Sequence, residues 1–157
     1  MKKNDKLISA LNSLLVNKLT VINQFMVDSE LCENSGYTKL HKVLQKLATD
    51  QMLLAEWLIE RISFLDGSDT LSELSTLMIS KTVSEMMTNS KKPDAFRTHY
   101  EAILLAQEVD DEVTAELLAK IIKMEEVHIN WKEIQREQIE QRGLENYLMT
   151  QTESMAN

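Results

Sequence analysis

The scarcity of helix-breaking residues constrains this chain more than any other feature of its sequence. Its 157 residues contain three glycines and one proline, at Gly36, Gly67, Gly143 and Pro93. Each glycine follows a long stretch with helical periodicity, and glycine just past a helix end adopts the left-handed conformation at little cost. These positions therefore predict a few long helices separated by short connections.

The first two helices are expected over residues 4–35 and 38–66, each with one row of residues at helical spacing that faces a core. The first row is Ile8, Leu11, Leu15, Lys18, Ile22 and Phe25, and the second is Leu40, Leu44, Leu47, Gln51, Leu54, Leu58 and Leu65. Lys18 and Gln51 are thus polar residues in rows that are otherwise apolar.

The second half of the chain is less sharply divided. Residues 67–82 resemble a crossover segment, and a helix that restarts near residue 82 is interrupted at 89–94. Residues 94–142 are helical in pattern without glycine or proline, which is too long for one helix in a small domain. We place a break at 109–111 and a short tail helix at 144–151. The whole pattern predicts one all-α domain over residues 1–157, a four-helix bundle with a long crossover and a short fifth helix.

Composition excludes several functional classes. The chain has 17 basic and 25 acidic residues and a net charge of −8, which disfavours binding to nucleic acid or to an anionic membrane. No stretch approaches the length of a membrane-spanning apolar helix. The N-terminus lacks the apolar run of a signal peptide. Cys32 is the only cysteine, so we expect no disulfide framework and a reducing, cytoplasmic location.

Glu125 and His128 are the strongest candidates for a metal site. They are three residues apart on a predicted helix, and therefore share the face that Leu118 and Ile121 direct into the bundle. A Glu-x-x-His pair facing a bundle core is half of a di-iron carboxylate site, and these ligands suit iron, manganese or zinc. The same spacing also arises often as a hydrogen-bonded core pair, so from these residues alone both interpretations stay open.

Short co-linear strings along the chain carry a resemblance to a known family. They are Leu11-Asn12, Leu14-Leu15, Asn17, Ile22-Asn23-Gln24, Asn34, Gly36, Ile59-Glu60-Arg61-Ile62, Phe64-Leu65, Gly67, Glu125-Glu126, His128-Ile129, Trp131, Gly143-Leu144 and Asn146-Tyr147-Leu148. With one short gap near residues 87–100, the sequence resembles bacterioferritin, the haem-containing branch of the ferritins, over nearly its whole length.

The resemblance implies a ferritin-like bundle that assembles into a hollow twenty-four-subunit shell and stores iron as a ferric mineral. It also implies a haem b between each two-fold pair of subunits, held by one methionine from each side. Met52 matches that methionine, and Leu19, Ile22, Asn23 and Met26 match positions that line the family's haem pocket.

The residues around Met52 support haem binding only modestly. Met52 shares a stripe with Ala48, Ala55 and Ile59, and we expect the two alanines to leave room for a flat group. Methionine is also a common gap-filler in cores, and this chain has nine.

The chain departs from the family where iron is oxidised. Of the six ferroxidase ligands that the resemblance implies, only Glu125 and His128 are kept, while Lys18, Gln51 and Leu54 replace Glu, Glu and His. The remaining Glu falls in the gapped stretch, where Lys92 or Asp94 stands. Phe25 replaces a tyrosine beside the site, and on the inner surface Lys46 replaces a histidine although Asp50 is kept.

Lys18 decides what this departure means. An ammonium in the ligand row repels Fe²⁺. We expect it to donate to Glu125, with Gln51 as a neutral third partner; the alternative is that Lys18 extends into solvent.

His41 and His99 are expected to be surface residues, and Trp57 and Trp131 to lie in cores or interfaces.

Two functions from different classes follow. The first is a haem-binding subunit of an iron-storage cage, homo- or hetero-oligomeric, that depends on a ferroxidase-competent partner subunit and on an electron-donor protein for the haem. The second is a metal-dependent ferroxidase or oxidase with an altered site around Glu125 and His128, completed by Asp94. A bundle with a purely structural role is a third, plainer possibility.

Overall fold

Six helices make up the computed structural model, which describes residues 2–67, 79–89 and 96–153. They are α1 (Lys2–Asn34), α2 (Thr38–Phe64), α3 (Val83–Asn89), α4 (Arg97–Glu108), α5 (Glu112–Arg142) and α6 (Leu144–Met149). No strand occurs in these ranges, so the all-α prediction is confirmed. Among the same residues, no helix is long and apolar enough to cross a membrane.

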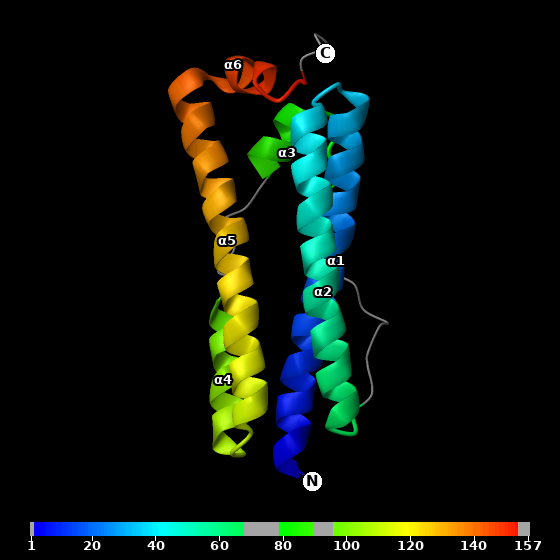
Figure 1. Cartoon of the computed structure of the whole chain (residues 1–157), viewed down its shortest axis with the longest axis vertical. Coiled ribbons are helices and arrows are strands. Elements are labelled where there is room, and N and C mark those ends of the chain that lie inside the picture. Colours follow the sequence, from blue (N-terminus) through cyan, green and yellow to red (C-terminus); the bar gives the residue numbers. More distant parts are fainter. Residues whose placement is uncertain (1, 68–78, 90–95, 154–157) are drawn as a thin grey trace.

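Three long helices run the length of the molecule, and two short ones share the fourth corner of the bundle. α1, α2 and α5 contain 33, 27 and 31 residues, whereas α3 and α4 contain 7 and 12. Figure 1 shows α4 beside the first part of α5, and α3 at the opposite end of the bundle, beneath α6. The fold is therefore a four-helix bundle as predicted, but its fourth position is shared by α3 and α4, and α4 is shorter than a typical bundle helix.

The breaks between helices follow local chemistry. Gly36 and Gly143 have φ of 82° and 80°, as expected after helices α1 and α5. The predicted break at 109–111 is confirmed: Asp110 has φ of 58°, and the Asp111 carboxylate caps α5 by accepting a hydrogen bond from the Thr114 backbone N–H at 3.1 Å.

Gly67 ends α2 for a different reason from the one expected. The positive φ belongs to Asp66, at 61°. A Cβ atom on Gly67 would lie 2.8 Å from Cγ2 of Ile8 and 2.9 Å from Cγ2 of Ile62. Glycine is needed there because α1 and the end of α2 approach closely. Most of the predicted crossover, residues 68–78, lies outside the described residues.

The two predicted core rows of α1 and α2 are buried, except that Ile8 and Leu65 are half-buried. Lys18 and Gln51 lie inside with the leucines, at 2% and 1% exposure. At the far end of the bundle, Tyr147 of α6 is fully buried and its hydroxyl donates to Gln135 Oε1 at 2.7 Å. Polar groups therefore enter the core in the middle of α1 and α2 and again at the end where α6 packs.

Candidate functional site

Lys18 is the centre of a buried polar cluster halfway along the bundle. Its Nζ atom donates to Glu125 Oε1 at 2.7 Å and lies 2.9 Å from His99 Nε2. The predicted contact with Glu125 is therefore confirmed, and the alternative that Lys18 extends into solvent is wrong. One ammonium group thus joins helices α1, α4 and α5.

His99 is a member of this cluster that the sequence did not reveal. The expectation that it lies on the surface is wrong, because its side chain is 2% exposed. An ammonium only donates, so the Nε2 atom of His99 accepts from Lys18, and a neutral His99 ring carries its proton on Nδ1. Its place could not be deduced because the chain just before α4 fixes no helical register.

Gln51 connects Glu125 to His128. Its Nε2 atom donates to Glu125 Oε1 at 3.0 Å and to His128 Nδ1 at 3.1 Å. Because Nδ1 accepts, the proton of a neutral His128 ring is on Nε2, which lies 3.1 Å from Asp50 Oδ2. Within the described residues, Gln51 Oε1 is a buried oxygen without a hydrogen-bond partner. Turning the amide over would place that oxygen against the Glu125 carboxylate, so the orientation is fixed.

The electrostatics of the cluster favour a charged Glu125. Burial acts to raise the pKa of Glu125, but attraction and a hydrogen bond from Lys18, the Gln51 amide and nearby His128 outweigh it, and the pKa is lowered. The pKa of Asp50 is also lowered: its partial burial is outweighed by hydrogen bonds and attraction from Lys46 and His128. The cluster therefore holds a carboxylate whose charge Lys18 balances.

The described residues of this cluster do not form a complete set of metal ligands. Leu54, which is fully buried, offers no donor atom. In the part of the chain that the structure describes, no three His, Cys, Asp or Glu side chains are grouped so that they could hold a metal ion. The Lys18 ammonium also lies against one of the two carboxylate oxygens of Glu125. Lys92 and Asp94, the candidates for a further ligand, lie outside the described residues.

The candidate haem residues lie on and beneath the outer surface of α1 and α2. Met52 and Met26 are 44% and 51% exposed, Leu19 and Asn23 are half-buried, and Ile22 is in the bundle core at 7% exposure. Since Lys18 and Gln51 both reach Glu125, the middle of α1 lies level with the middle of α2. Met26 and Met52 are thus exposed thioethers, one on each of two helices that pack side by side.

The small residues near Met52 do not serve the purpose expected of them. Ala48 and Ala55 are 2% and 4% exposed and belong to the cores on either side of the polar cluster. The interpretation that they leave room for a flat group beside Met52 is wrong, because they face the interior of the same bundle.

His41 is only partly the surface residue that was expected. Its side chain is 13% exposed, and its Nδ1 atom lies 2.8 Å from Ser29 Oγ. The two tryptophans are half-buried, as expected of core or interface residues.

Comparison with known proteins agrees with this architecture. A profile for the ferritin-like domain matches residues 8–142. The chain is 32% identical over 154 residues to bacterioferritin of Mycolicibacterium paratuberculosis, with 94% of each chain covered. It is 31% identical to a bacterial ferritin of Synechocystis sp., covering 96% of this chain and 99% of that one, and 31% identical to bacterioferritin of Brucella melitensis, covering 94% and 92%. The chain therefore belongs to the bacterioferritin family.

Proposed function

We propose that this chain is a haem-binding subunit of an iron-storage cage that has no working iron-oxidising centre of its own. The observation that carries the proposal is the 2.7 Å contact between Lys18 Nζ and Glu125 Oε1 inside the bundle. An ammonium and Fe²⁺ compete for the same carboxylate and repel each other. A subunit with Lys18 in this position would therefore form part of the cage wall but would not oxidise Fe²⁺.

The storage role rests on family membership over nearly the full length of the relatives. Large apolar side chains are exposed on α1, α2, α4 and α5, among them Met26, Met52, Phe64, Leu104 and Val127. In a cage, neighbouring subunits would cover side chains of this kind. Iron is the cargo of such an assembly, and a cytoplasmic location, predicted from the lone Cys32, agrees with that role.

Haem binding rests on the residues at the outer surface of α1 and α2. Met52 of α2 offers a thioether at 44% exposure, which a two-fold partner can approach, and the neighbouring helix α1 carries exposed Met26 and half-buried Leu19 and Asn23. These residues suit a flat apolar ligand, with Ile22 supporting them from the core. A thioether-ligated haem b supplies one-electron transfer when bound. The chain's own contribution would be the Met52 thioether, which would bind the haem iron, and apolar side chains that would exclude water.

We expect this subunit to depend on a partner subunit, because it keeps the cage fold but has lost the ligands of the iron-oxidising site. Iron must be oxidised before it is stored as a ferric mineral. A second subunit type with a complete ligand set would supply that step, and an electron-donor protein would reduce the haem when iron is released.

The test compares pure shells of this chain with shells that contain a rising share of a ferroxidase-competent bacterioferritin subunit. Oxidation of Fe²⁺ is followed by the absorbance of the ferric product. Pure shells should oxidise iron barely faster than buffer, and mixed shells should gain rate in proportion to the partner subunit. A pure shell that oxidises iron as fast as the partner's own shell would overturn the proposal.

A further inference from the structure

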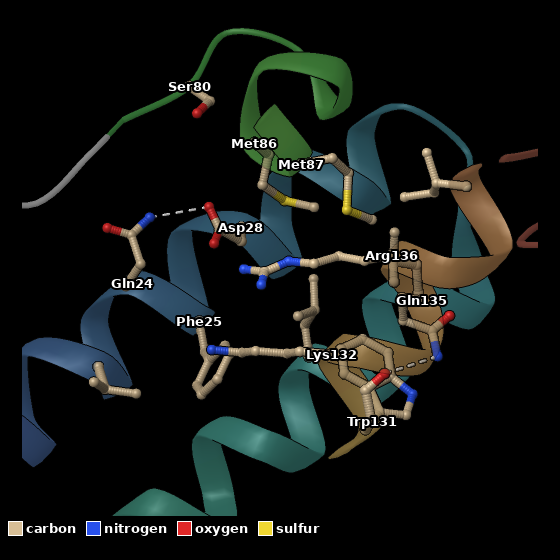
Figure 2. A pocket seen from close by; sticks show the side chains of 14 residues that line it. Gln24, Phe25, Asp28, Ser80, Met86, Met87, Trp131, Lys132, Gln135 and Arg136 are labelled. Carbon is tan, nitrogen blue, oxygen red and sulfur yellow. Dashed lines mark hydrogen bonds between the residues drawn. The ribbon is translucent and has the colours of Figure 1, made fainter. Parts of the chain in front are cut away.

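A cavity of about 260 Å³ lies between α1, α2, α3 and α5, toward the end of the bundle where α6 lies. Its apolar lining includes Phe25, Leu44, Met86 and Trp131 (Figure 2). The side chains of the Lys18 cluster do not line it. An apolar cavity of about 150 Å³ is enough to hold benzene. This cavity therefore has room for an aromatic ring with a short substituent.

Lys132 brings an ammonium group into these apolar surroundings. The side chain is half-buried, and Figure 2 shows it extending from α5 toward Phe25 of α1. Its Nζ atom lies 4.8 Å from the centre of the Phe25 ring. Burial lowers the pKa of Lys132, against attraction to Glu125 and Asp28. The ammonium is therefore partly removed from solvent and lies over an aromatic ring.

Lys132 lacks a hydrogen-bond acceptor in the part of the chain that the structure describes. No oxygen or nitrogen atom there accepts a hydrogen bond from its Nζ atom. Asp28, a carboxylate in the same lining, accepts from Gln24 at 3.0 Å instead. Arg136 has an interaction partner of its own. A partly buried donor without an acceptor is costly, so the cavity presents a strong donor that still needs one.

We propose that this cavity binds a small molecule with an aromatic body and an oxygen atom that accepts a hydrogen bond. The oxygen accepts from Lys132 Nζ, and the aromatic body lies against Trp131 and Phe25. Met86 and Met87 of α3 adapt to its shape, because methionine side chains are flexible and polarisable. Water alone would satisfy the ammonium but would gain nothing from the apolar lining. The proposal does not depend on iron storage or haem.

The test uses acetophenone, which carries a carbonyl oxygen, and ethylbenzene, which has nearly the same shape without that oxygen. Each probe is titrated into the purified full-length protein by calorimetry, and the ratio of the two dissociation constants is measured. Both probes should bind saturably. In a Trp57→Phe background, Trp131 is the sole tryptophan, and acetophenone should change its fluorescence over the same concentration range.

A lysine variant isolates the hydrogen bond. Lys132→Met roughly keeps the length of the side chain and removes the donor. Acetophenone should then lose about tenfold in affinity relative to ethylbenzene, which is the effect of one hydrogen bond from a charged donor. Ethylbenzene shares the apolar contacts, so its binding checks that the cavity of the variant is intact. Lys123→Met replaces an exposed lysine on the same helix and should leave the ratio unchanged.

Three results would overturn the proposal. The first is a failure of acetophenone to bind saturably to the wild-type protein, which needs no variant. The second is an unchanged ratio of dissociation constants in folded Lys132→Met, which would show that the ammonium does not recognise the oxygen. The third is unchanged Trp131 fluorescence while acetophenone binds, which would place the ligand outside this cavity.

Discussion

Lys18 and Glu125 are separated by 107 positions in the chain, yet their side chains meet at 2.7 Å in the middle of the bundle. Both side chains are largely out of water, at 2% and 11% exposure. A buried pair of this kind need not add stability relative to apolar residues of the same size. Removing one partner lowers the free energy of unfolding strongly, because the other partner is then a buried charge without compensation.

Replacing Lys18 alone should therefore be severe. We expect Lys18→Met to destabilise the subunit by about 3–5 kcal/mol. Lys18→Met combined with Glu125→Leu should recover much of that loss. Denaturant unfolding at a fixed subunit concentration measures both, with exposed Lys123→Met as the matched control. Equal stabilities of wild type and the single variant would mean that the pair contributes nothing.

The contribution of Glu125 should depend on pH in a defined direction. Its pKa is lowered from 4.5 in the folded state, so its ionised form stabilises the fold. That stabilisation is complete above pH 4.5 and is lost as the pH falls through the lower folded value. The stability difference between wild type and Glu125→Gln should be constant at neutral pH and should shrink in acid. A difference that grows in acid would contradict this assignment.

Restoring the missing ligands should create a metal site. Lys18→Glu, Gln51→Glu and Leu54→His together rebuild the ligand set that the resemblance implies, apart from the glutamate of the gapped stretch. We expect Fe²⁺ oxidation by pure shells to rise about tenfold or more above the wild-type rate. Zn²⁺ should raise the melting temperature of the triple variant and not that of wild type or of Lys123→Glu. A folded triple variant that neither binds metal nor oxidises iron would contradict the proposed origin of the defect.

Met52 provides the test of haem binding. Met52→Leu should remove or shift the visible haem spectrum while the shell still assembles, because the thioether proposed to bind the haem iron is lost. Met149→Leu replaces another exposed methionine, at 73% exposure, and should leave the spectrum unchanged. Haem spectra that are identical in all three proteins would exclude Met52 as a ligand.

Asp28 should destabilise the fold when it ionises. Burial raises its pKa from 3.8 to about 6, against the weaker opposing effects of Gln24 and Lys132. The folded state therefore holds this proton more tightly than the unfolded chain, and stability is lost as the pH rises between those two values. Asp28→Asn should be more stable than wild type at neutral pH and should lose this advantage near pH 4. Measuring the melting temperature of both proteins across this range tests the sign.

The sequence predicted helix boundaries and core residues best where the spacing of apolar residues and the helix-breaking residues agreed. The inward rows of α1 and α2 placed Lys18 and Gln51 in the core, and a buried carboxylate at Glu125 then predicted the ion pair. The break before α5 was located from a run of four acidic residues between Glu108 and Glu112. In the structure Asp110 has a positive φ there and Asp111 caps α5. These are local properties that a single sequence expresses directly.

The contacts that were missed depend on register or on detailed orientation. His99 follows a stretch without a fixed helical phase, and no side-chain cap anchors α4, so its face could not be deduced. The side chains of Ala48 and Ala55 point in directions about 40° and 60° from that of Met52 around the axis of α2. That difference is enough to place the alanines in the core and Met52 on the surface. The cavity lined by Phe25, Leu44, Met86 and Trp131 is built from four helices, α1, α2, α3 and α5, and no sequence period describes that arrangement.

The ammonium of Lys18 is attached to the chain, whereas a metal must be supplied by the cell. A site that awaits metal carries unbalanced negative charge during iron starvation, and its stability follows the metal supply. Here the middle of the bundle is neutralised as soon as the backbone folds, whatever the iron status. A chelator should therefore not change the free energy of unfolding of this subunit. The subunit would stay folded and able to assemble when little iron is present to be stored.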